Sequence, residues 1–409
     1  MYARHRLDIS VGQLLFALGA SLVERDEAGI AERIEKAWSG EGDALVCLSV
    51  RSGFDLLLQA LALPPGSEIL VSAVTIPDMV RVIEGHGLRA IPVDLDLDTL
   101  APSLQLLERA VSERSRAILV AHLFGGLVDL APIAGFARRH DLLLLEDAAQ
   151  GFVGPASTGD PAADISMFSF GPIKTSTALG GALLRVKDPA TLERMRRLHE
   201  SWPVQSRSAF LTRVVRFLGL TLASRPLAYG LLAGSCRAAG ADFDSMINST
   251  VRGFSASTPS ALLQRIRRRP CAPLLALLGR RLETFDLARL ARRTEVGERA
   301  SRALPPGIVQ PGKLACRRTH WVFPVLTPDP SALVAVLNRN GFDATQASTT
   351  IAAVEPPPDR PEFDPAGSKA MLSKIVFLPV YPEVPDREIR RLLKVLSRVG
   401  GEIAPGGTL

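Results

Sequence analysis

The sequence lacks the paired cysteines on which many small folds and metal sites depend. Its four cysteines, Cys47, Cys236, Cys271 and Cys316, lie far apart and form no CxxC motif. This spacing excludes zinc ribbons, thioredoxin-like redox sites and cysteine-bound clusters. We therefore expect no metal site, and a reducing, cytoplasmic setting.

Long apolar runs, repeats and a strong charge of one sign are also missing. The first apolar stretch, residues 11–22, is interrupted by Gln13 and two glycines, so we expect no secretory signal. The net charge is only +6. The arginine clusters at 194–197 and 265–269 have no interleaved aromatic residues and are typical of solvated helix faces. We therefore expect no nucleic-acid partner.

The composition is that of a globular protein, with 409 residues, 47% of them apolar and 22% charged. From about residue 40 to 190, short apolar runs alternate with helix-period stretches. This pattern predicts α/β units around a mainly parallel sheet. The predicted strands are residues 44–47, 68–71, 88–93, 117–121, 142–145, 165–168 and 181–184. The predicted helices between them are residues 54–63, 77–87, 103–111 and 130–140.

The pattern predicts three parts along the chain. Residues 1–40 form an N-terminal helical segment, residues 41–300 a large α/β domain, and residues 301–409 a small α+β domain that follows a Pro-Pro-Gly turn. In the small domain we expect extended runs at 319–326 and 375–381, and helices at 330–340 and 386–399.

Residues 209–240 form a strongly apolar insertion interrupted by arginines. Neither apolar half reaches the roughly 18 residues of a spanning helix. Three hypotheses remain open: packing in a dimer, a lid over an apolar substrate, and attachment to an anionic membrane surface at the inner face of the membrane. The membrane hypothesis depends on one helical stripe: Phe210, Leu211, Val214, Phe217, Leu218 and Leu222.

Three short segments carry candidate chemistry. The predicted strand at 142–145 runs into Glu146 and Asp147, and ligands of open α/β sheets lie at the carboxyl ends of strands. A solvated strand-end acid would look the same. Lys174 follows another strand and precedes a Gly-Gly turn; in apolar surroundings such a lysine can act as an amine nucleophile toward an aldehyde cofactor. An ordinary surface lysine is the alternative.

The third segment is Ser52-Gly53, which opens a predicted helix. Unpaired N–H groups and the positive end of the helix dipole at such a turn bind phosphate. A plain serine cap is the alternative interpretation.

Taken in order, these segments resemble the DegT/DnrJ/StrS family of pyridoxal-phosphate (PLP) sugar aminotransferases. The shared elements are Ser-Gly at a first helix, Glu-Asp-Ala-Ala-Gln after a strand, and Ser-Phe-x-x-x-Lys before Gly-Gly. Further matches are His122-Leu-Phe-Gly125 and the closing Phe377-Leu-Pro-Val-Tyr-Pro382. The resemblance implies fold type I, with a mainly parallel central sheet flanked by helices, a smaller α+β C-terminal domain, and PLP as cofactor.

The family's functional residues are carried over position by position. The resemblance implies that Lys174 forms a Schiff base with PLP and moves protons, and that Asp147 pairs with the pyridinium nitrogen. Gln150 would contact the ring hydroxyl, while Ser169 and the amides around Gly53 would hold the phosphate. The cofactor-binding residues implied in this way are Ser52, Gly53, Phe54, Asp55, Ile76, Asp147, Gln150, Ser169, Lys174 and Asn248.

The chain departs from the family pattern at three places. Phe54 stands where the family commonly has threonine, and Ile76 where it has an aromatic ring that stacks on the cofactor. The segment that reaches the neighbouring subunit's phosphate is not recognisable, and Asn248 or Arg252 would substitute for it.

The leading hypothesis is an aminotransferase that moves an amino group from a donor such as glutamate to a keto group. The family's usual acceptor is a nucleotide-linked keto sugar, and its members imply a homodimer. Two alternatives stay open: a PLP-binding regulator or scaffold without transaminase activity, and an aminotransferase acting on a lipid-linked ketone at the membrane surface.

Overall fold

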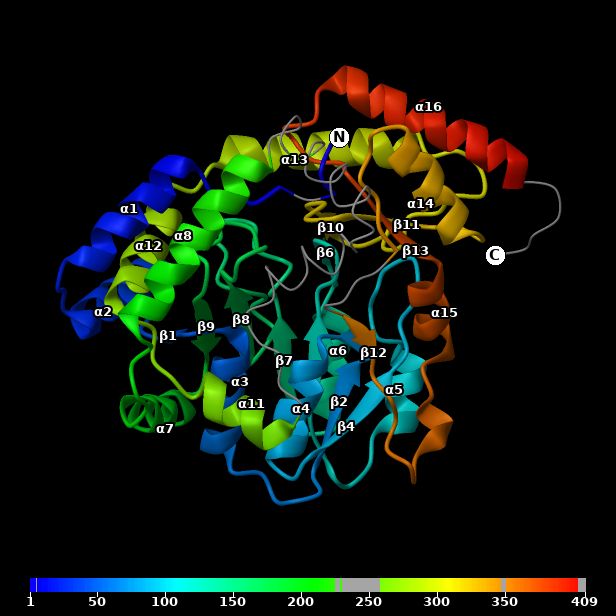
Figure 1. Ribbon diagram of the computed structural model, residues 1–409. Coiled ribbons are helices and arrows are strands. Elements are labelled where there is room, and N and C mark those ends of the chain that lie inside the picture. The colour runs from blue at the N-terminus through cyan, green and yellow to red at the C-terminus, as the bar shows by residue number, and fades with distance from the viewer. Residues whose placement is uncertain (5, 225–228, 230–257, 347–350, 404–409) are drawn as a thin grey trace.

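The structure is a computed structural model that describes residues 1–4, 6–224, 229, 258–346 and 351–403 (Figure 1). The predicted site residue Asn248, its alternative Arg252, Cys236 and most of residues 225–240 lie outside the described residues.

A seven-stranded sheet forms the centre of the protein, with the strand order β1-β9-β8-β7-β5-β2-β4. Its strands are β1 (Ala44–Cys47), β2 (Glu68–Ser72), β4 (Arg89–Val93), β5 (Ser115–Ala121), β7 (Leu143–Asp147), β8 (Ile165–Ser169) and β9 (Ala182–Val186). Strand β9 runs antiparallel to both of its neighbours, and the five strands from β8 to β4 pair in parallel. All seven predicted strands are present, so the predicted mainly parallel sheet is confirmed.

Helices cover both faces of the sheet, because the central strands bury their side chains in two different directions. Ile69, Val71 and Leu145 belong to one hydrophobic core, while Leu70 and Leu144 belong to another. The first core lies under α3 (Val50–Leu61), α4 (Pro77–Gly85), α7 (Pro189–Glu200) and α11 (Pro259–Ile266). The second lies under α5 (Leu104–Ala110) and α6 (Ala131–Arg139).

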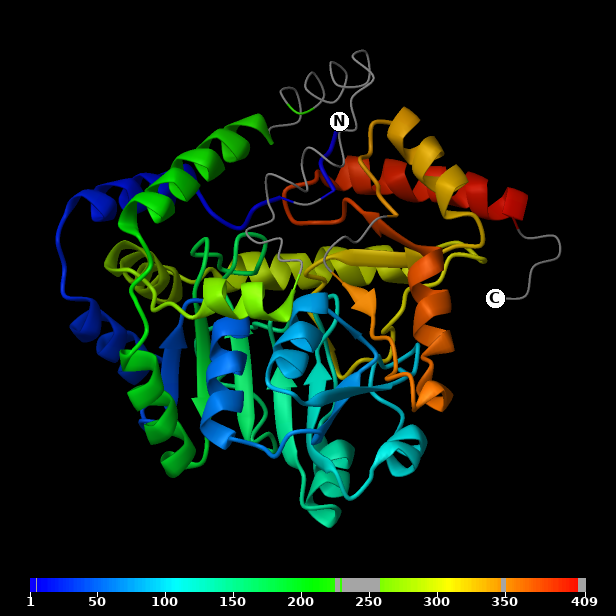
Figure 2. The ribbon, with the colours of Figure 1, turned by 60° about the horizontal axis from the view of Figure 1, so that its bottom comes forward.

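A third core belongs to the C-terminal elements. The antiparallel pair β11 (Phe323–Leu326) and β13 (Ile375–Leu378) packs with α14 (Pro330–Arg339) and α16 (Asp386–Ile403). Helix α13 (Leu287–Arg302) passes between these elements and the sheet (Figures 1 and 2) and runs across the predicted boundary at residue 300. The division of the chain at residues 40 and 300 stays a prediction.

Short elements join the C-terminal part to the sheet. Strand β10 (Arg317–Arg318) pairs with β6 (Gly126–Leu127), and β12 (Ala352–Ala353) pairs with β3 (Val74–Thr75). The 3-10 turn η1 (Pro361–Phe363) and α15 (Ala366–Lys374) follow β12. These contacts bring the segment around Trp321 to the end of the sheet at which β5 and β7 terminate.

The N-terminal helices pack against the beginning of the apolar insertion. Helices α1 (Val11–Leu22) and α2 (Glu27–Trp38) share a core with α8 (Arg207–Ala223) and α12 (Ala272–Glu283). Phe210, Val214 and Phe217 of α8 are buried in this core. The interpretation of this stripe as a membrane-binding face is therefore wrong for these three side chains, because they are covered by the chain itself.

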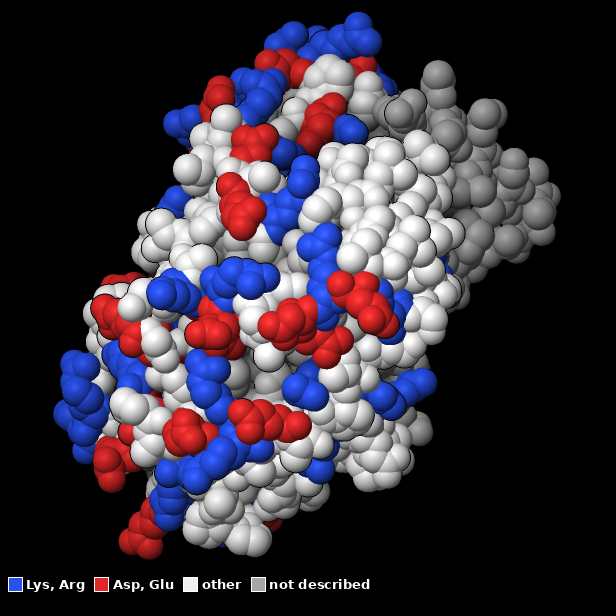
Figure 3. All heavy atoms as spheres, turned by 90° about the vertical axis from the view of Figure 1, so that its left-hand side faces the viewer, with Lys and Arg blue, Asp and Glu red and all other residues white. Residues whose placement is uncertain are grey.

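Apolar side chains on the outer side of the same two helices are exposed. Val215 is 55% exposed and Leu222 is 47% exposed on α8, and Leu15 of α1 is 54% exposed. The face to which α1 and α8 contribute shows a stretch of surface without charged side chains (Figure 3). Within the described residues, no helix combines the length and the apolar character that crossing a membrane requires.

Candidate active site

A cavity of about 390 Å³ lies at the carboxyl ends of the central strands, where ligands of α/β sheets bind. This volume is in the usual range for small-molecule sites. The cavity brings together five residues predicted from separate segments of the sequence. They are Ile76, Asp147, Gln150, Ser169 and Lys174.

Lys174 lies in the turn between β8 and β9, at the cavity wall. Its Nζ is 4.4 Å from the centroid of the Trp321 ring, a cation–π distance. Burial lowers the pKa of Lys174 to about 8; the negative charge of Asp147 opposes this effect, and the positive charge of Arg51 adds to it. A substantial fraction of the amine is therefore unprotonated near neutral pH, as an amine nucleophile requires.

Asp147 is the last residue of β7 and is buried beside the cavity. The Ala149 N–H donates to its Oδ1 at 2.9 Å. Burial raises the pKa of Asp147, although the Ala149 amide and the charge of Lys174 oppose the rise. A cationic group bound next to this carboxylate would offset the free-energy cost of burying its negative charge.

Glu146 has a different role, because successive residues of a strand point to opposite faces. Its Oε1 lies 2.8 Å from His122 Nε2, and its Oε2 accepts the Asp160 N–H. The Val128 N–H donates to His122 Nδ1 at 3.1 Å, so Nε2 carries the ring proton and donates to Glu146. Glu146 thus orients His122, which lines the cavity, and does not face the cavity itself.

Helix α3 begins at Val50, four residues before the predicted start at residue 54. Ser49 is the N-cap, and its Oγ accepts the Ser52 N–H at 3.2 Å. The Gly53 N–H donates to the Ser49 carbonyl at 3.0 Å, so it closes the first helical turn. The amides that open the helix toward the cavity are therefore those of Ser49, Val50 and Arg51.

The predicted phosphate-binding residues Ser52, Gly53, Phe54 and Asp55 are buried and are not among the residues that line the cavity, so their role in phosphate binding stays a prediction. A Cβ on Gly53 would lie 2.5 Å from a methyl carbon of Leu184, which means that glycine lets α3 approach β9. Phe54 packs in the core below α3.

Asp55 is held in a buried polar cluster on the far side of α3. Arg267 donates to both of its carboxylate oxygens at 3.0 Å, His86 Nε2 lies 2.8 Å from Oδ1, and Gln59 donates to Oδ2. This cluster ties α3 to α4 and to the residue after α11, and it leaves Asp55 no part in the cavity.

Three further predicted residues lie at the cavity wall. Gln150 Oε1 accepts the Phe124 N–H at 2.7 Å, which fixes its amide. The Ser169 hydroxyl accepts the Gly171 N–H at 3.4 Å. Ile76 caps α4 and is partly exposed toward the cavity.

Sequence reasoning missed Arg51, Arg213 and Trp321, all of which line the cavity. Arg51 is adjacent to the Ser-Gly pair of the predicted phosphate site, and Arg213 is one of the arginines that interrupt the apolar insertion. A prediction with Ser49 as the helix cap would have placed Arg51 in the first turn of α3, at the predicted phosphate site. The sequence carries no local signal that brings Arg213 or Trp321 to Lys174.

Distant segments fix the turn that carries Lys174. The Trp321 indole donates to the Ile173 carbonyl at 2.9 Å, and Asp8 accepts the Ser176 N–H at 2.8 Å. The bonds that other side chains make to this turn are Arg293 to the Thr175 hydroxyl, Arg281 to the Thr177 carbonyl and Arg213 to the Leu179 carbonyl.

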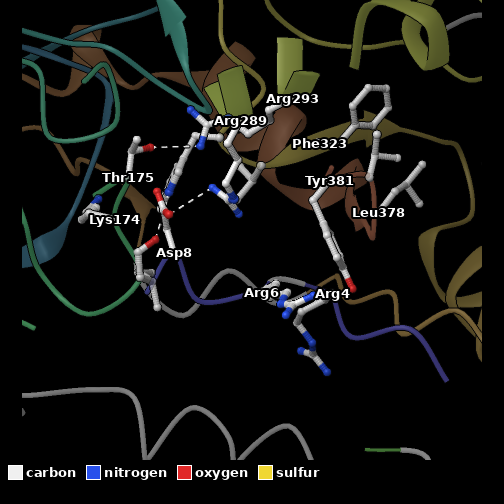
Figure 4. A pocket seen from close by; sticks show the side chains of 14 residues that line it. Arg4, Arg6, Asp8, Lys174, Thr175, Arg289, Arg293, Phe323, Leu378 and Tyr381 are labelled. Atoms are coloured by element: carbon white, nitrogen blue, oxygen red, sulfur yellow. Dashed lines mark hydrogen bonds and ion pairs between the residues drawn. The ribbon is translucent and has the colours of Figure 1, made fainter. Parts of the chain in front are cut away.

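A second, much smaller cavity of about 20 Å³ lies behind this turn (Figure 4). Arg289 pairs with Asp8 at 3.1 Å and with Glu383 at 2.8 Å, and Arg293 donates to Thr175 at 3.2 Å. This space is large enough only for water, so we interpret its charged groups as anchors of the lysine turn. Among the described residues, no three His, Cys, Asp or Glu side chains form a group that could hold a metal ion.

Comparison with solved structures identifies the class of fold. The aminotransferase TlmJ from Streptoalloteichus hindustanus has a TM-score of 0.69 at 18% identity, with 98% of this chain and 99% of that chain covered. PseC from Helicobacter pylori has a TM-score of 0.68 at 14% identity, with 98% and 99% covered. The predicted fold type I architecture is confirmed.

Comparison of sequences then finds a match to one family over part of the chain. Residues 31–215 match the model of the DegT/DnrJ/EryC1/StrS aminotransferase family, so the resemblance inferred from the sequence is confirmed over this segment. A "pleiotropic regulatory protein" of Geobacillus stearothermophilus is 32% identical over 194 residues. This match covers 46% of the chain and only 50% of that relative's length.

Proposed function

We propose that the protein is a PLP-dependent aminotransferase that moves an amino group from an amino acid such as glutamate to a keto group. One observation carries the proposal: Lys174 with a lowered pKa and the buried carboxylate of Asp147 line the same cavity. Perturbed groups of this kind in a cavity of ligand size are characteristic of active sites.

The residues around the cavity fit PLP. Lys174 would supply the amine for the cofactor's aldehyde, and Asp147 an anion for its ring nitrogen. The first turn of α3 and Ser169 would supply hydrogen-bond donors for its phosphate. Gln150 would lie near the ring hydroxyl. When bound, PLP supplies an electron sink that stabilises negative charge at the substrate carbon.

The chain's own residues would then bind, hold and move protons. Lys174 Nζ, with its pKa of about 8, can both accept and return a proton near neutral pH. Asp147 would keep a proton on the cofactor's ring nitrogen, since a buried carboxylate is most stable beside a cation. Trp321 covers the lysine from the side of the C-terminal part and limits its contact with water.

The acceptor that we propose is a nucleotide-linked keto sugar, used by a cytoplasmic homodimer. PseC is an aminotransferase involved in the biosynthesis of pseudoaminic acid, and another structural neighbour is the sugar aminotransferase CalS13 from Micromonospora echinospora. These neighbours support a sugar acceptor. The buried stripe of α8 argues against the alternative of a lipid-linked ketone at a membrane.

A regulator that binds PLP without transamination is the second candidate. The relative from Geobacillus stearothermophilus is named a regulatory protein, and this observation alone favours the candidate.

The two candidates differ in how the bound cofactor responds to an amino donor. Purified protein with PLP should show the absorbance of lysine-bound cofactor, and glutamate should bleach this band toward that of pyridoxamine phosphate. A keto sugar nucleotide should then restore it. A stable band that glutamate and other amino acids leave unchanged would contradict the aminotransferase proposal and support the regulator.

A further inference from the structure

Arg51 is held at the cavity by a carboxylate of the neighbouring helix. It is the second residue of α3, and its Nη1 lies 2.6 Å from Oδ2 of Asp78 in α4. The other oxygen of Asp78 accepts from Arg81 at 2.9 Å. Asp78 thus holds the Arg51 guanidinium at the cavity through a charge-assisted hydrogen bond.

Arg213 reaches the same end of α3 from α8. Its Nη1 donates to the Leu179 carbonyl at 2.8 Å, and a Cβ on Gly180 would lie 3.4 Å from this nitrogen. The next residue, Gly181, donates its N–H to the carbonyl of Leu48, which immediately precedes the helix cap. These short links place the guanidinium of Arg213 beside the N-terminus of α3.

The two arginines also interact electrostatically with each other. Burial lowers the pKa of Arg213, and the positive charge of Arg51 contributes to the decrease. Within the described part of the chain, no carboxylate lies within 4.0 Å of the Arg213 guanidinium. Two guanidinium groups at one partly buried site destabilise each other unless an anion lies near both.

Among the residues that the structure describes, the charges around the cavity are unbalanced. The cations on its wall are Arg51, Arg81, Lys174 and Arg213, and the carboxylates are Asp78 and Asp147. Four positive charges against two negative charges leave an excess of two. A phosphate monoester carries a charge of about −1.5 to −2 at pH 7, which would balance this excess.

We propose that Arg51 and Arg213 form a clamp for the phosphate group of PLP at the N-terminus of α3, within the subunit that carries Lys174. Guanidinium groups bind phosphate through short, charge-assisted hydrogen bonds. The clamp takes over the task for which the sequence suggested a partner subunit's residue. This inference rests on the proposed function, because it assigns residues to that function's cofactor.

The test compares PLP with pyridoxal, which has the same aldehyde and ring but no phosphate. Dissociation constants are measured by absorbance titration of the cofactor-free full chain, with no turnover. Arg51→Gln and Arg213→Gln should each weaken PLP binding by about tenfold or more, the size of one lost charge-assisted bond. Binding of pyridoxal should change by no more than about twofold, well below the loss of one such bond.

One matched variant controls for the loss of a positive charge. Arg216→Gln removes an exposed arginine from α8 that does not line the cavity. It should keep the preference for PLP within about threefold, since charges near solvent interact weakly with the site. Arg51→Lys keeps the charge and should restore most of the preference, which a variant that fails to fold would not do.

A nucleoside diphosphate could bind to the same two arginines, so uridine diphosphate is tested as a competitor of PLP. One contrary outcome is that Arg51→Gln and Arg213→Gln weaken the binding of uridine diphosphate while the ratio of the dissociation constants for PLP and pyridoxal stays at the wild-type value. In that case the arginines bind the substrate, and the proposed clamp is wrong. An unchanged ratio without any effect on uridine diphosphate also overturns it. If wild-type protein binds neither PLP nor pyridoxal, the proposed function itself fails together with the clamp.

Discussion

Replacement of Asp147 by asparagine should make Lys174 more reactive at neutral pH while it destroys catalysis. A pKa of about 8 leaves about one in ten Lys174 amines neutral at pH 7, whereas an ordinary lysine has about one in 3,000 neutral. The charge of Asp147 raises the pKa of Lys174. Its removal should therefore move the midpoint of the titration below 8.

The midpoint can be measured without cofactor. Cofactor-free protein is labelled briefly with acetic anhydride between pH 6 and 10, and peptide mass spectrometry gives the labelling of Lys174 relative to exposed Lys36. Wild type should show a midpoint near 8 and Asp147→Asn a lower one. Transamination by Asp147→Asn should fall by orders of magnitude with cofactor still bound, because an amide cannot hold a proton on the ring nitrogen.

Glu146→Gln is the matched control on the same strand. Glu146 contacts His122 and not Lys174, so this variant should leave the midpoint close to the wild-type value. A wild-type midpoint near 10, or an Asp147→Asn midpoint at or above that of wild type, would refute the electrostatic reasoning. Near-normal transamination by Asp147→Asn would refute the proposed role of this residue.

Four further variants test the site and the fold. Lys174→Ala should abolish transamination and leave the thermal unfolding temperature nearly unchanged; a borohydride-reduced cofactor adduct mapped to another lysine in wild type would contradict the assignment. Phe217→Ser should lower the free energy of unfolding by about 3–5 kcal/mol, since the ring is buried against α1 and α12, while Leu222→Ser on the exposed side should change it by about 0.5 kcal/mol or less. Equal effects in urea unfolding would show that the packing of α8 is misassigned. Arg267→Ala should cost about 1.5–3 kcal/mol in the same assay, because it removes a charge-assisted pair from the buried carboxylate of Asp55, and unchanged stability would argue against this pair.

The sheet could be predicted because its strands are buried on both faces. Such strands are continuous apolar runs, and the runs at residues 44–47, 68–71 and 165–168 each became a strand. The positions of Asp147 and Lys174 were also predictable, since Asp147 ends one strand, Lys174 lies in the turn after the next, and the carboxyl ends of neighbouring parallel strands meet at one edge. Local sequence therefore contained the two residues on which the proposed chemistry depends.

The start of α3 was predicted wrongly because two serines compete for the cap. Both Ser49 and Ser52 precede a helix-period pattern, and sequence periodicity does not fix a helix boundary more closely than a few residues. The close approach of Gly53 to Leu184 decides between them, since it places the pair Ser52-Gly53 inside the helix and against β9.

The apolar insertion also shows that sequence periodicity alone does not decide what a helix packs against. Its stripe of phenylalanines is what either a buried helix or a membrane-binding helix needs, and only the presence of α1 and α12 above it distinguishes the two.

The sequence by itself thus determined the sheet, because its strands follow from local patterns of burial, and its resemblance to the family singled out Asp147 and Lys174. The tertiary structure decided which side chains surround that pair. Arg51, Arg213 and Trp321 come from three separate parts of the chain, and packing of α8 and the C-terminal part against the sheet brings them to Lys174. Contacts between residues so far apart in sequence depend on how whole elements pack, and no local pattern encodes them.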